Sequence, residues 1–329
     1  MKENYYILKS GDLIRKGNTI HFKTDEKTRA LPVANIDTFY IFGEVNFNKR
    51  FLEFLGKKNI TMHFYNYYGF YIGSYFPREY LNSGLIIVKQ VEHYLDNVKR
   101  LILAKEFING AIHNILSNLK YYLRRGKELT NEIKEIEDLR KNIPTAFKIA
   151  ELMGIEGNIR KRYYHSFNKI LREGFTFKER VKRPPDNKIN CLLSFGNSLL
   201  YRTVLTELYH TYLNPTISYL HQPAQSRFSL SLDIAEIFKP VIVDPVIFSL
   251  INKQKINETH FEKSLNHCYL NEKGKEVFLK EYDDKLHVTV KHEQLKRNVS
   301  YKRLIRLDCY RIIKHLVDDK TFSSYKRSW

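Results

Sequence analysis

The sequence predicts an α+β protein of two domains, a small N-terminal β-rich domain followed by a larger all-α domain. Short β-branched or aromatic runs separated by turn residues fill residues 1–76, and apolar residues recur every three or four positions from residue 86 onward. The stretch 77–85, which includes Pro77 and Gly84, fits neither period and is the predicted linker. We therefore expect a β-rich domain at 1–76 and a helical domain at 86–329.

In the N-terminal part we expect strands joined by tight turns, with one short helix among them. Gly17 and Asn18 form a two-residue turn between two strand-like runs. Phe51 and Phe54 belong to the apolar face of the helix, which Gly56 is expected to end. The predicted strands are residues 5–8, 13–16, 19–23, 36–41, 61–64 and 70–75.

The remaining chain has the apolar spacing of helices. The segments in which we expect them are 91–125, 131–141, 190–212, 233–251, 260–270, 274–292 and 300–317. The tail, 321–329, is polar and basic, so we expect it to fray.

The chain carries a large positive charge. It has 55 Lys or Arg against 36 Asp or Glu, a formal charge of +19, which indicates a polyanionic partner, nucleic acid before an anionic membrane. The first 85 residues hold 12 basic and 8 acidic side chains and the rest 43 and 28, so most of the excess lies in the helical part. The sequence has no apolar run of about 18 residues and no secretory signal pattern, and its three distant cysteines suit a reducing cytoplasm.

One stretch in the helical part concentrates groups that can bind a metal ion. Asp233 and Glu236 are three residues apart in a predicted helix, so both carboxylates lie on one face, where like charges repel. His221 lies upstream, in a segment that Pro223 keeps out of the helix. An imidazole beside two carboxylates indicates a site for Mg²⁺ or Mn²⁺. The spacing is also typical of an exposed loop histidine followed by a solvated acidic helix start.

A second stretch, residues 156–183, combines basic and aromatic side chains. It holds nine Lys or Arg and three Asp or Glu, with Tyr163 and Tyr164 among them. Cations with interposed aromatic rings suit contacts to phosphates together with stacking on bases or sugars. The alternative is a solvated helix in which the tyrosines pack inward and Glu156 interacts favourably with the helix dipole.

Three motifs, in this order, resemble those of a known family. Glu156-Gly157, followed by basic residues and an aromatic pair, is similar to the first motif of that family. Residues 190–201 are similar to its Asn-x-Leu-Leu-Ser-Phe-Gly-x-x-Leu-Leu segment, and residues 219–240 to its histidine and acidic-helix signature. Together they resemble the CRISPR-associated endonuclease and integrase of spacer acquisition, the first-numbered Cas protein family, over essentially the whole chain.

This resemblance implies a metal-dependent DNA endonuclease and integrase that inserts short DNA spacers into a CRISPR repeat array by transesterification. It implies that Glu156, His221 and Glu236 bind one Mg²⁺ or Mn²⁺ ion and that Asp233 lies beside the ion as a fourth catalytic residue. It further implies a homodimer, formed largely through the β-rich domains, and a complex with the second-numbered small Cas protein. The expected location is the prokaryotic cytoplasm, and no membrane partner is expected.

Basic residues near these motifs are candidates for contacts with prespacer, repeat or branched DNA. The candidates are Arg160, Arg162, Lys169, Arg183 and Arg227. Two rival functions are a basic nucleic-acid-binding scaffold, which would bind DNA without cutting it, and a repair nuclease. The repair nuclease would cut branched DNA without joining a spacer to a repeat.

Overall fold

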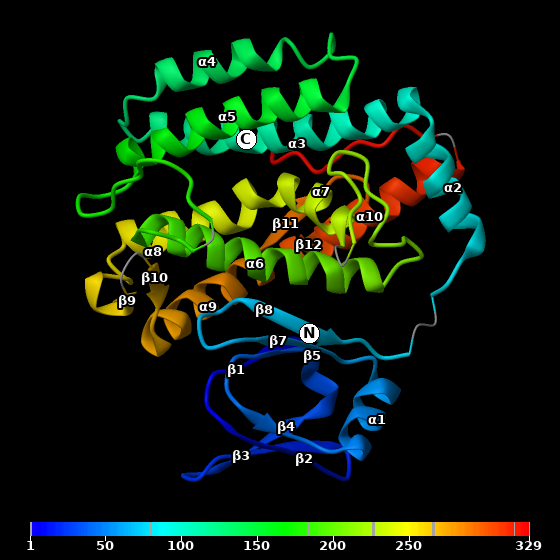
Figure 1. Cartoon of the computed structure of the whole chain (residues 1–329), viewed down its shortest axis with the longest axis vertical. Helices are drawn as coiled ribbons and strands as arrows, with labels where there is room; N and C mark the ends of the chain where they lie inside the picture. Colours follow the sequence, from blue (N-terminus) through cyan, green and yellow to red (C-terminus); the bar gives the residue numbers. More distant parts are fainter. Residues whose placement is uncertain are drawn as a thin grey trace. The chain divides into compact units, whose positions relative to one another are not determined.

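The structure is a computed structural model that describes residues 2–78, 81–182, 184–225, 228–264, 267–318 and 320–328. It divides into two compact units, Met1–Tyr80 with Leu270–Leu279, and Leu81–Tyr269 with Lys280–Trp329. The chain has the mixed helix and strand content that the sequence predicted (Figure 1).

The first unit contains two four-stranded sheets. One sheet has the order β1 (Glu3–Ile7), β5 (Ile36–Ile41), β7 (Thr61–Tyr65) and β8 (Tyr71–Tyr75), with only the last pair antiparallel. The other has the order β4 (Thr28–Pro32), β3 (Thr19–Lys23), β2 (Gly11–Lys16) and β6 (Val45–Asn46). The predicted strands are confirmed. The sequence did not indicate β6, which has only two residues, or β4, which buries only one of its five side chains.

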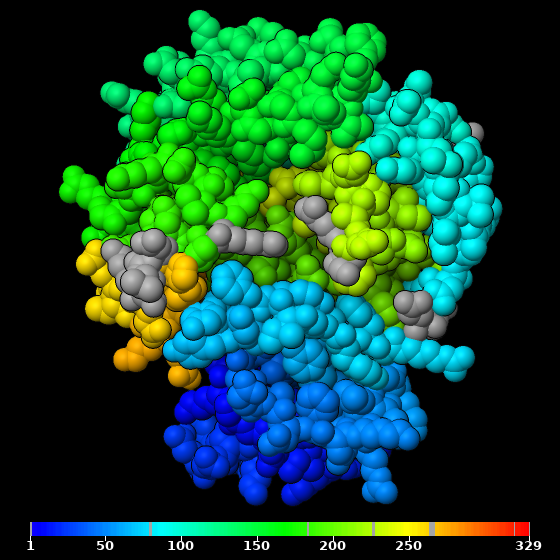
Figure 2. Space-filling model, viewed as in Figure 1, coloured from blue at the N-terminus to red at the C-terminus, as the bar shows by residue number. Residues whose placement is uncertain are grey.

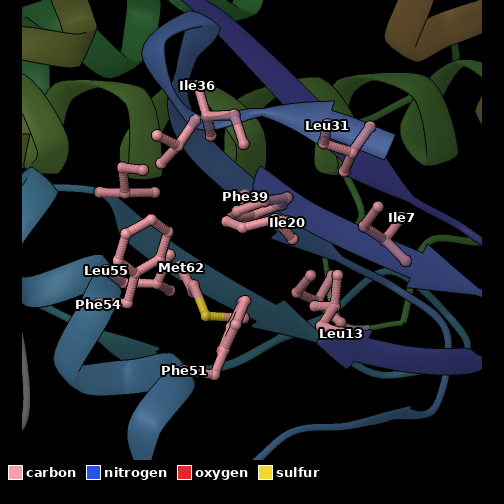
Figure 3. Close-up of a cluster of buried hydrophobic side chains, with 13 residues drawn as sticks. Ile7, Leu13, Ile20, Leu31, Ile36, Phe39, Phe51, Phe54, Leu55 and Met62 are labelled. Atoms are coloured by element: carbon pink, nitrogen blue, oxygen red, sulfur yellow. The ribbon is translucent and has the colours of Figure 1, made fainter. Parts of the chain in front are cut away.

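A cluster of apolar side chains from both sheets and from α1 (Lys49–Lys58) forms the core of this unit (Figure 3). The helix contributes Phe51, Phe54 and Leu55, as its apolar face predicted. It continues two residues beyond Gly56 and ends where Asn59 adopts the left-handed conformation, with φ 55°. Asparagine tolerates this conformation and, like glycine, can end a helix.

The second unit is built around α3 (Asn97–Leu123), which packs against α4 (Thr130–Arg140), α5 (Ile149–Ile170) and α7 (Ser229–Phe238). The other helices described in this unit are α2 (Gly84–Leu95), α6 (Lys188–Tyr209), α8 (Asp244–Asn252) and α10 (Tyr301–Val317), while α9 (Glu272–His287) begins in the first unit and ends in the second. A π-helical segment, Lys239–Val243, joins α7 to α8, and a short 3₁₀ turn covers Glu258–His260; another 3₁₀ turn, Val33–Asn35, belongs to the first unit. In Figure 2 the green atoms of α4 lie on the surface.

The expectation of an all-α second domain is wrong. Two hairpins, β9 (Phe261–Ser264) with β10 (His267–Leu270) and β11 (Thr289–His292) with β12 (Arg297–Ser300), interrupt the helices. Residues 260–270 were expected to be helical, but a short apolar run does not distinguish a helix from a strand, and burial alternates along β10.

The helix expected over 91–125 is divided by Asp96. Its carboxylate accepts hydrogen bonds from the backbone N–H groups of Val98 and Lys99 and so caps the start of α3. None of the helices in the described ranges combines the length and the apolar character needed to cross a membrane.

The polar tail is docked rather than frayed. The backbone N–H groups of Ser324, Tyr325 and Arg327 donate to side chains of Glu106, Asp308 and Asn114, over 2.9, 2.8 and 2.9 Å. These partners lie on α3 and α10, more than 15 residues away in sequence, which is why a reading of local composition missed them.

Candidate active site

Two helices and one loop supply the predicted site residues. Glu156 lies on α5, Asp233 and Glu236 lie one turn apart on α7, and His221 lies in the loop that joins α6 to α7. Every residue of α7 is buried, and the helix packs against α3, α6 and α10. A carboxylate on such a helix must find its partners within the protein.

Asp233 holds the loop that carries His221. Its Oδ2 accepts hydrogen bonds from the backbone N–H groups of Tyr219 and Leu220, over 2.7 and 3.0 Å. Its Oδ1 accepts from the backbone N–H of His221 over 2.9 Å and lies 2.8 Å from the Nδ1 atom of the same residue. A carboxylate at Nδ1 selects the tautomer with the proton on Nδ1, which leaves Nε2 as an acceptor. Asp233 therefore sets the orientation of the imidazole.

Glu236 is held between two cations. Its Oε1 accepts a hydrogen bond from Nζ of Lys239, and its Oε2 accepts one from Nη2 of Arg160. Burial favours the neutral form of this carboxyl and by itself would raise its pKa. The positive charges of Lys239 and Arg160, with a smaller effect of His221, outweigh burial and place the pKa of Glu236 below its usual range. The His221 ring is therefore near enough to act on Glu236 electrostatically.

Arg160 brings the acids of two helices together. Besides its bond to Glu236, its Nε donates to Oε1 of Glu156 over 3.0 Å, an i,i+4 pair along α5. Only 8% of Arg160 is exposed. One guanidinium thus joins two carboxylates that lie 80 positions apart in the sequence.

Lys182 interacts electrostatically with both glutamates, and Arg180 lies near enough to act on Lys182. Burial is the main cause that lowers the pKa of Lys182, and the charges of Lys239 and Arg180 lower it further. The guanidinium of Arg180 donates to Asn190 over 3.1 Å and to Ser194 over 3.0 Å. We call Arg160, Arg180, Lys182 and Lys239 the basic cluster. Its positive charge makes the surroundings of two carboxylates attractive to a phosphate.

Another buried acid, Asp244, lies near this group at the start of α8. Burial raises its pKa to about 7, although Arg160, Tyr163 and Lys239 favour its charged form. The hydroxyl of Tyr163 is its hydrogen-bonding neighbour, although across the described ranges neither oxygen makes a bond of standard geometry.

The donor chemistry of the site fits a hard divalent cation. Two carboxylates and one imidazole are ligands suited to Mg²⁺ or Mn²⁺. The guanidinium that already lies between Glu156 and Glu236 indicates that a positive charge is favourable there. Within the part of the chain that the structure describes, no three acidic, histidine or cysteine side chains are gathered as a metal site. The two glutamates instead point at Arg160.

Comparison with known proteins identifies the family. A sequence model described as CRISPR associated protein Cas1 matches residues 5–284. The chain belongs to the Cas1 family. A curated relative from Thermodesulfovibrio yellowstonii, named CRISPR-associated endonuclease Cas1 2, is 52% identical over 330 residues, which cover 100% of both chains.

Solved structures agree with this assignment to the Cas1 family. A Cas1 protein from Thermotoga maritima has a TM-score of 0.86 and is 41% identical, over 98% of this chain and 100% of its own. A casposase bound to an integration product shares the fold, with a TM-score of 0.88 at 22% identity over 99% of this chain and 93% of its own. The family resemblance inferred from the three motifs is thereby confirmed.

The five basic residues proposed to contact DNA have different surroundings in this Cas1-family protein. Arg160 is buried against the two glutamates and does not face solvent. Arg162 and Lys169 are half-exposed on α5, where they pair with glutamates of α4. Arg183 and Arg227 lie outside the described residues.

Sequence reasoning missed Lys239, Lys182 and Arg180 as parts of the site. The position of Lys239, three residues after Glu236, was a local signal of an ion pair on one helix face. The other two lie in the segment between α5 and α6; they belong to the basic stretch 156–183, but their place beside the acids depends on how that segment folds back.

Proposed function

We propose that this Cas1-family protein is a divalent-metal-dependent DNA endonuclease and integrase that inserts short DNA spacers into a CRISPR repeat array by transesterification. The observation that carries the proposal is that Glu156 and Glu236 bind the same guanidinium, with His221 acting electrostatically on Glu236 and with further basic side chains near both acids. The curated relatives named endonucleases support the same reaction class.

In this proposal Glu156, Glu236 and Nε2 of His221 hold one Mg²⁺ or Mn²⁺ ion. When bound, the ion supplies positive charge that stabilises phosphoryl oxygens and lowers the pKa of an attacking hydroxyl. Asp233 acts through His221, because it fixes the ring with its Nδ1 proton turned inward. It is therefore a positioning residue rather than a ligand.

The positive charge of the basic cluster would attract the DNA backbone to the carboxylates of the site. Lys239, Lys182 and Arg180 would offset the repulsion between the glutamates and a phosphate backbone. Contacts of this kind orient DNA without reading its bases. On the exposed side of α5, Arg162 and Lys169 would have to exchange their glutamate partners for phosphates.

We further propose that the protein works as a homodimer, joined largely through its β-rich domains, with the small protein Cas2 as a partner. The proposed domains are residues 1–76 and 86–329, joined by the linker 77–85, and the proposed location is the prokaryotic cytoplasm. The positive charge of the chain, +19, supports a DNA substrate.

A strand-transfer assay tests this function. Purified protein, with and without Cas2, is mixed with a labelled short duplex and a supercoiled repeat plasmid, in Mn²⁺ or in EDTA. We expect metal-dependent joining by the wild type and none by His221→Ala. His165→Ala, which changes an exposed histidine on α5, is the matched control and should retain joining.

Two other outcomes would each favour a rival function. Nicking of branched DNA without joining, with Cas2 present, would identify a repair nuclease. DNA binding without any chemistry, in the wild type as in His221→Ala, would identify a scaffold.

A further inference from the structure

Arg160 occupies the position that a cation shared by Glu156 and Glu236 would take. Its Nε lies 3.0 Å from Oε1 of Glu156, and its Nη2 donates to Oε2 of Glu236. The arginine side chain is 10% exposed, so these ion pairs are shielded from water. Shielding strengthens them, because the local dielectric is low.

The charges of this group already balance without an added ion. The two glutamates carry two negative charges, and Arg160 and Lys239 carry two positive charges. A divalent ion placed on the same carboxylate oxygens would add two positive charges next to a buried guanidinium. Like charges close together in a buried place repel each other strongly. The divalent ion and the guanidinium therefore cannot both bind the two carboxylates without weakening each other's binding.

We propose that the divalent ion binds in competition with Arg160, whose guanidinium releases Glu156 and Glu236 and turns toward Asp244. The inference rests on the proposed function, because it concerns the same metal site. Arg160 is then an internal counter-ion that keeps the two acids together before the metal binds, and it weakens the binding of the metal.

Asp244 is a buried acid whose charge acts on Arg160. Burial disfavours the charge of Arg160, but nearby acids, including Asp244, more than compensate and raise its pKa. Among the described residues, Nη1 of Arg160 has no hydrogen bond of standard geometry, and the hydroxyl of Tyr163 is the hydrogen-bonding neighbour of Asp244. Buried polar atoms without partners are rare in folded proteins, so the unused donor of Arg160 allows a second arrangement in which it donates to the Asp244 carboxyl.

Calorimetric titration of the metal-free full chain with MnCl₂ tests the competition. We expect Arg160→Gln to bind Mn²⁺ more tightly than the wild type, on the order of tenfold, because two charge-assisted hydrogen bonds no longer have to be broken. Arg162→Gln, which removes an exposed arginine of the same helix, is the matched control and should bind as the wild type does. Arg160→Lys keeps the charge but cannot bridge two carboxylates, so its affinity should fall between those of the wild type and Arg160→Gln.

Two further variants complete the titration. Glu236→Gln should abolish saturable Mn²⁺ binding, which would show that the heat measured in the titration comes from binding at this site. Asp244→Asn should weaken Mn²⁺ binding, because it removes the acceptor for the displaced guanidinium. In the Arg160→Gln background the same change should weaken binding less, because no guanidinium is left to need that acceptor.

The outcomes separate the two proposals. If no variant shows saturable Mn²⁺ binding, the metal site of the proposed function is wrong. If the wild type binds Mn²⁺ through Glu236 but Arg160→Gln binds it equally or more weakly, the competition is wrong and Arg160 instead helps to hold the ligands. If Arg160→Lys binds Mn²⁺ as the wild type does while Arg160→Gln binds it more tightly, the competition arises from charge repulsion alone. The proposed contribution of the two bridging hydrogen bonds would then be wrong. The melting temperature of each variant, with and without Mn²⁺, checks that the metal-free protein is folded.

Discussion

Replacing Asp233 by asparagine should uncouple the His221 loop from α7. The carboxylate accepts four hydrogen bonds, two at each oxygen. An asparagine keeps one oxygen and turns an NH₂ group toward two of the N–H donors, so at least two bonds are lost at a fully buried place. Hydrogen bonds to a charged group are worth ~1.5–3 kcal/mol each, so the loss of two should lower the free energy of unfolding by about 3–6 kcal/mol.

Urea unfolding of the metal-free protein measures this effect through the transition midpoint. Asp138→Asn is the control, because Asp138 is an aspartate on α4 that pairs with Lys141 over 2.7 Å at the surface. We expect the midpoint to move little in the control and strongly in Asp233→Asn. Equal midpoints for the two variants would refute the reasoning that Asp233 organises the loop.

Two other predictions concern the tail and the pH dependence of stability. Gly110→Ala should lower the free energy of unfolding in urea by about 1–3 kcal/mol, because the new Cβ would lie 2.2 Å from Oγ of Ser324. Gly154→Ala is the control, because its new Cβ would meet nothing within 4 Å; it should be neutral or stabilise the protein by about 0.5–1 kcal/mol. A hydrogen bond to Asp283 raises the pKa of His287 from 6.5 to about 8, so the stability that this pair contributes is complete below pH 6.5 and is lost as the pH rises through about 8. The difference in unfolding free energy between wild type and His287→Gln should therefore shrink over that window, by less than ~1 kcal/mol because both side chains are partly exposed and solvent screens the pair. A difference that stays constant with pH would contradict this.

Glu156, His221, Asp233 and Glu236 could be proposed as site residues from the sequence, whereas the partners that they have in the structure could not. The three-residue spacing of Asp233 and Glu236 did predict one face of one helix, yet the structure gives the two carboxylates separate partners. Asp233 binds the backbone of a loop 12 to 14 positions earlier, and Glu236 binds an arginine 76 positions earlier. Such partners depend on how α5, α6 and α7 pack, which local spacing does not contain. The roles of these residues as ligands stay predictions.

In the fold, too, local structure could be predicted from the sequence, whereas contacts between distant segments could not. Period-two runs and the Gly17 turn predicted the strands of the first unit, because a hairpin is a local structure. The β9–β10 hairpin was missed because its strands are only four residues long and resemble a helix face. The docking of the tail depends on Glu106 and Asn114, more than 200 positions away.

Anomalous diffraction from crystals soaked in MnCl₂ tests the central claim most directly. The account predicts one strong manganese peak between the carboxylates of Glu156 and Glu236, within bonding distance of Nε2 of His221, with the guanidinium of Arg160 moved off both acids. A peak bound by other side chains, or no peak at saturating manganese with Arg160 still bridging the glutamates, would contradict it.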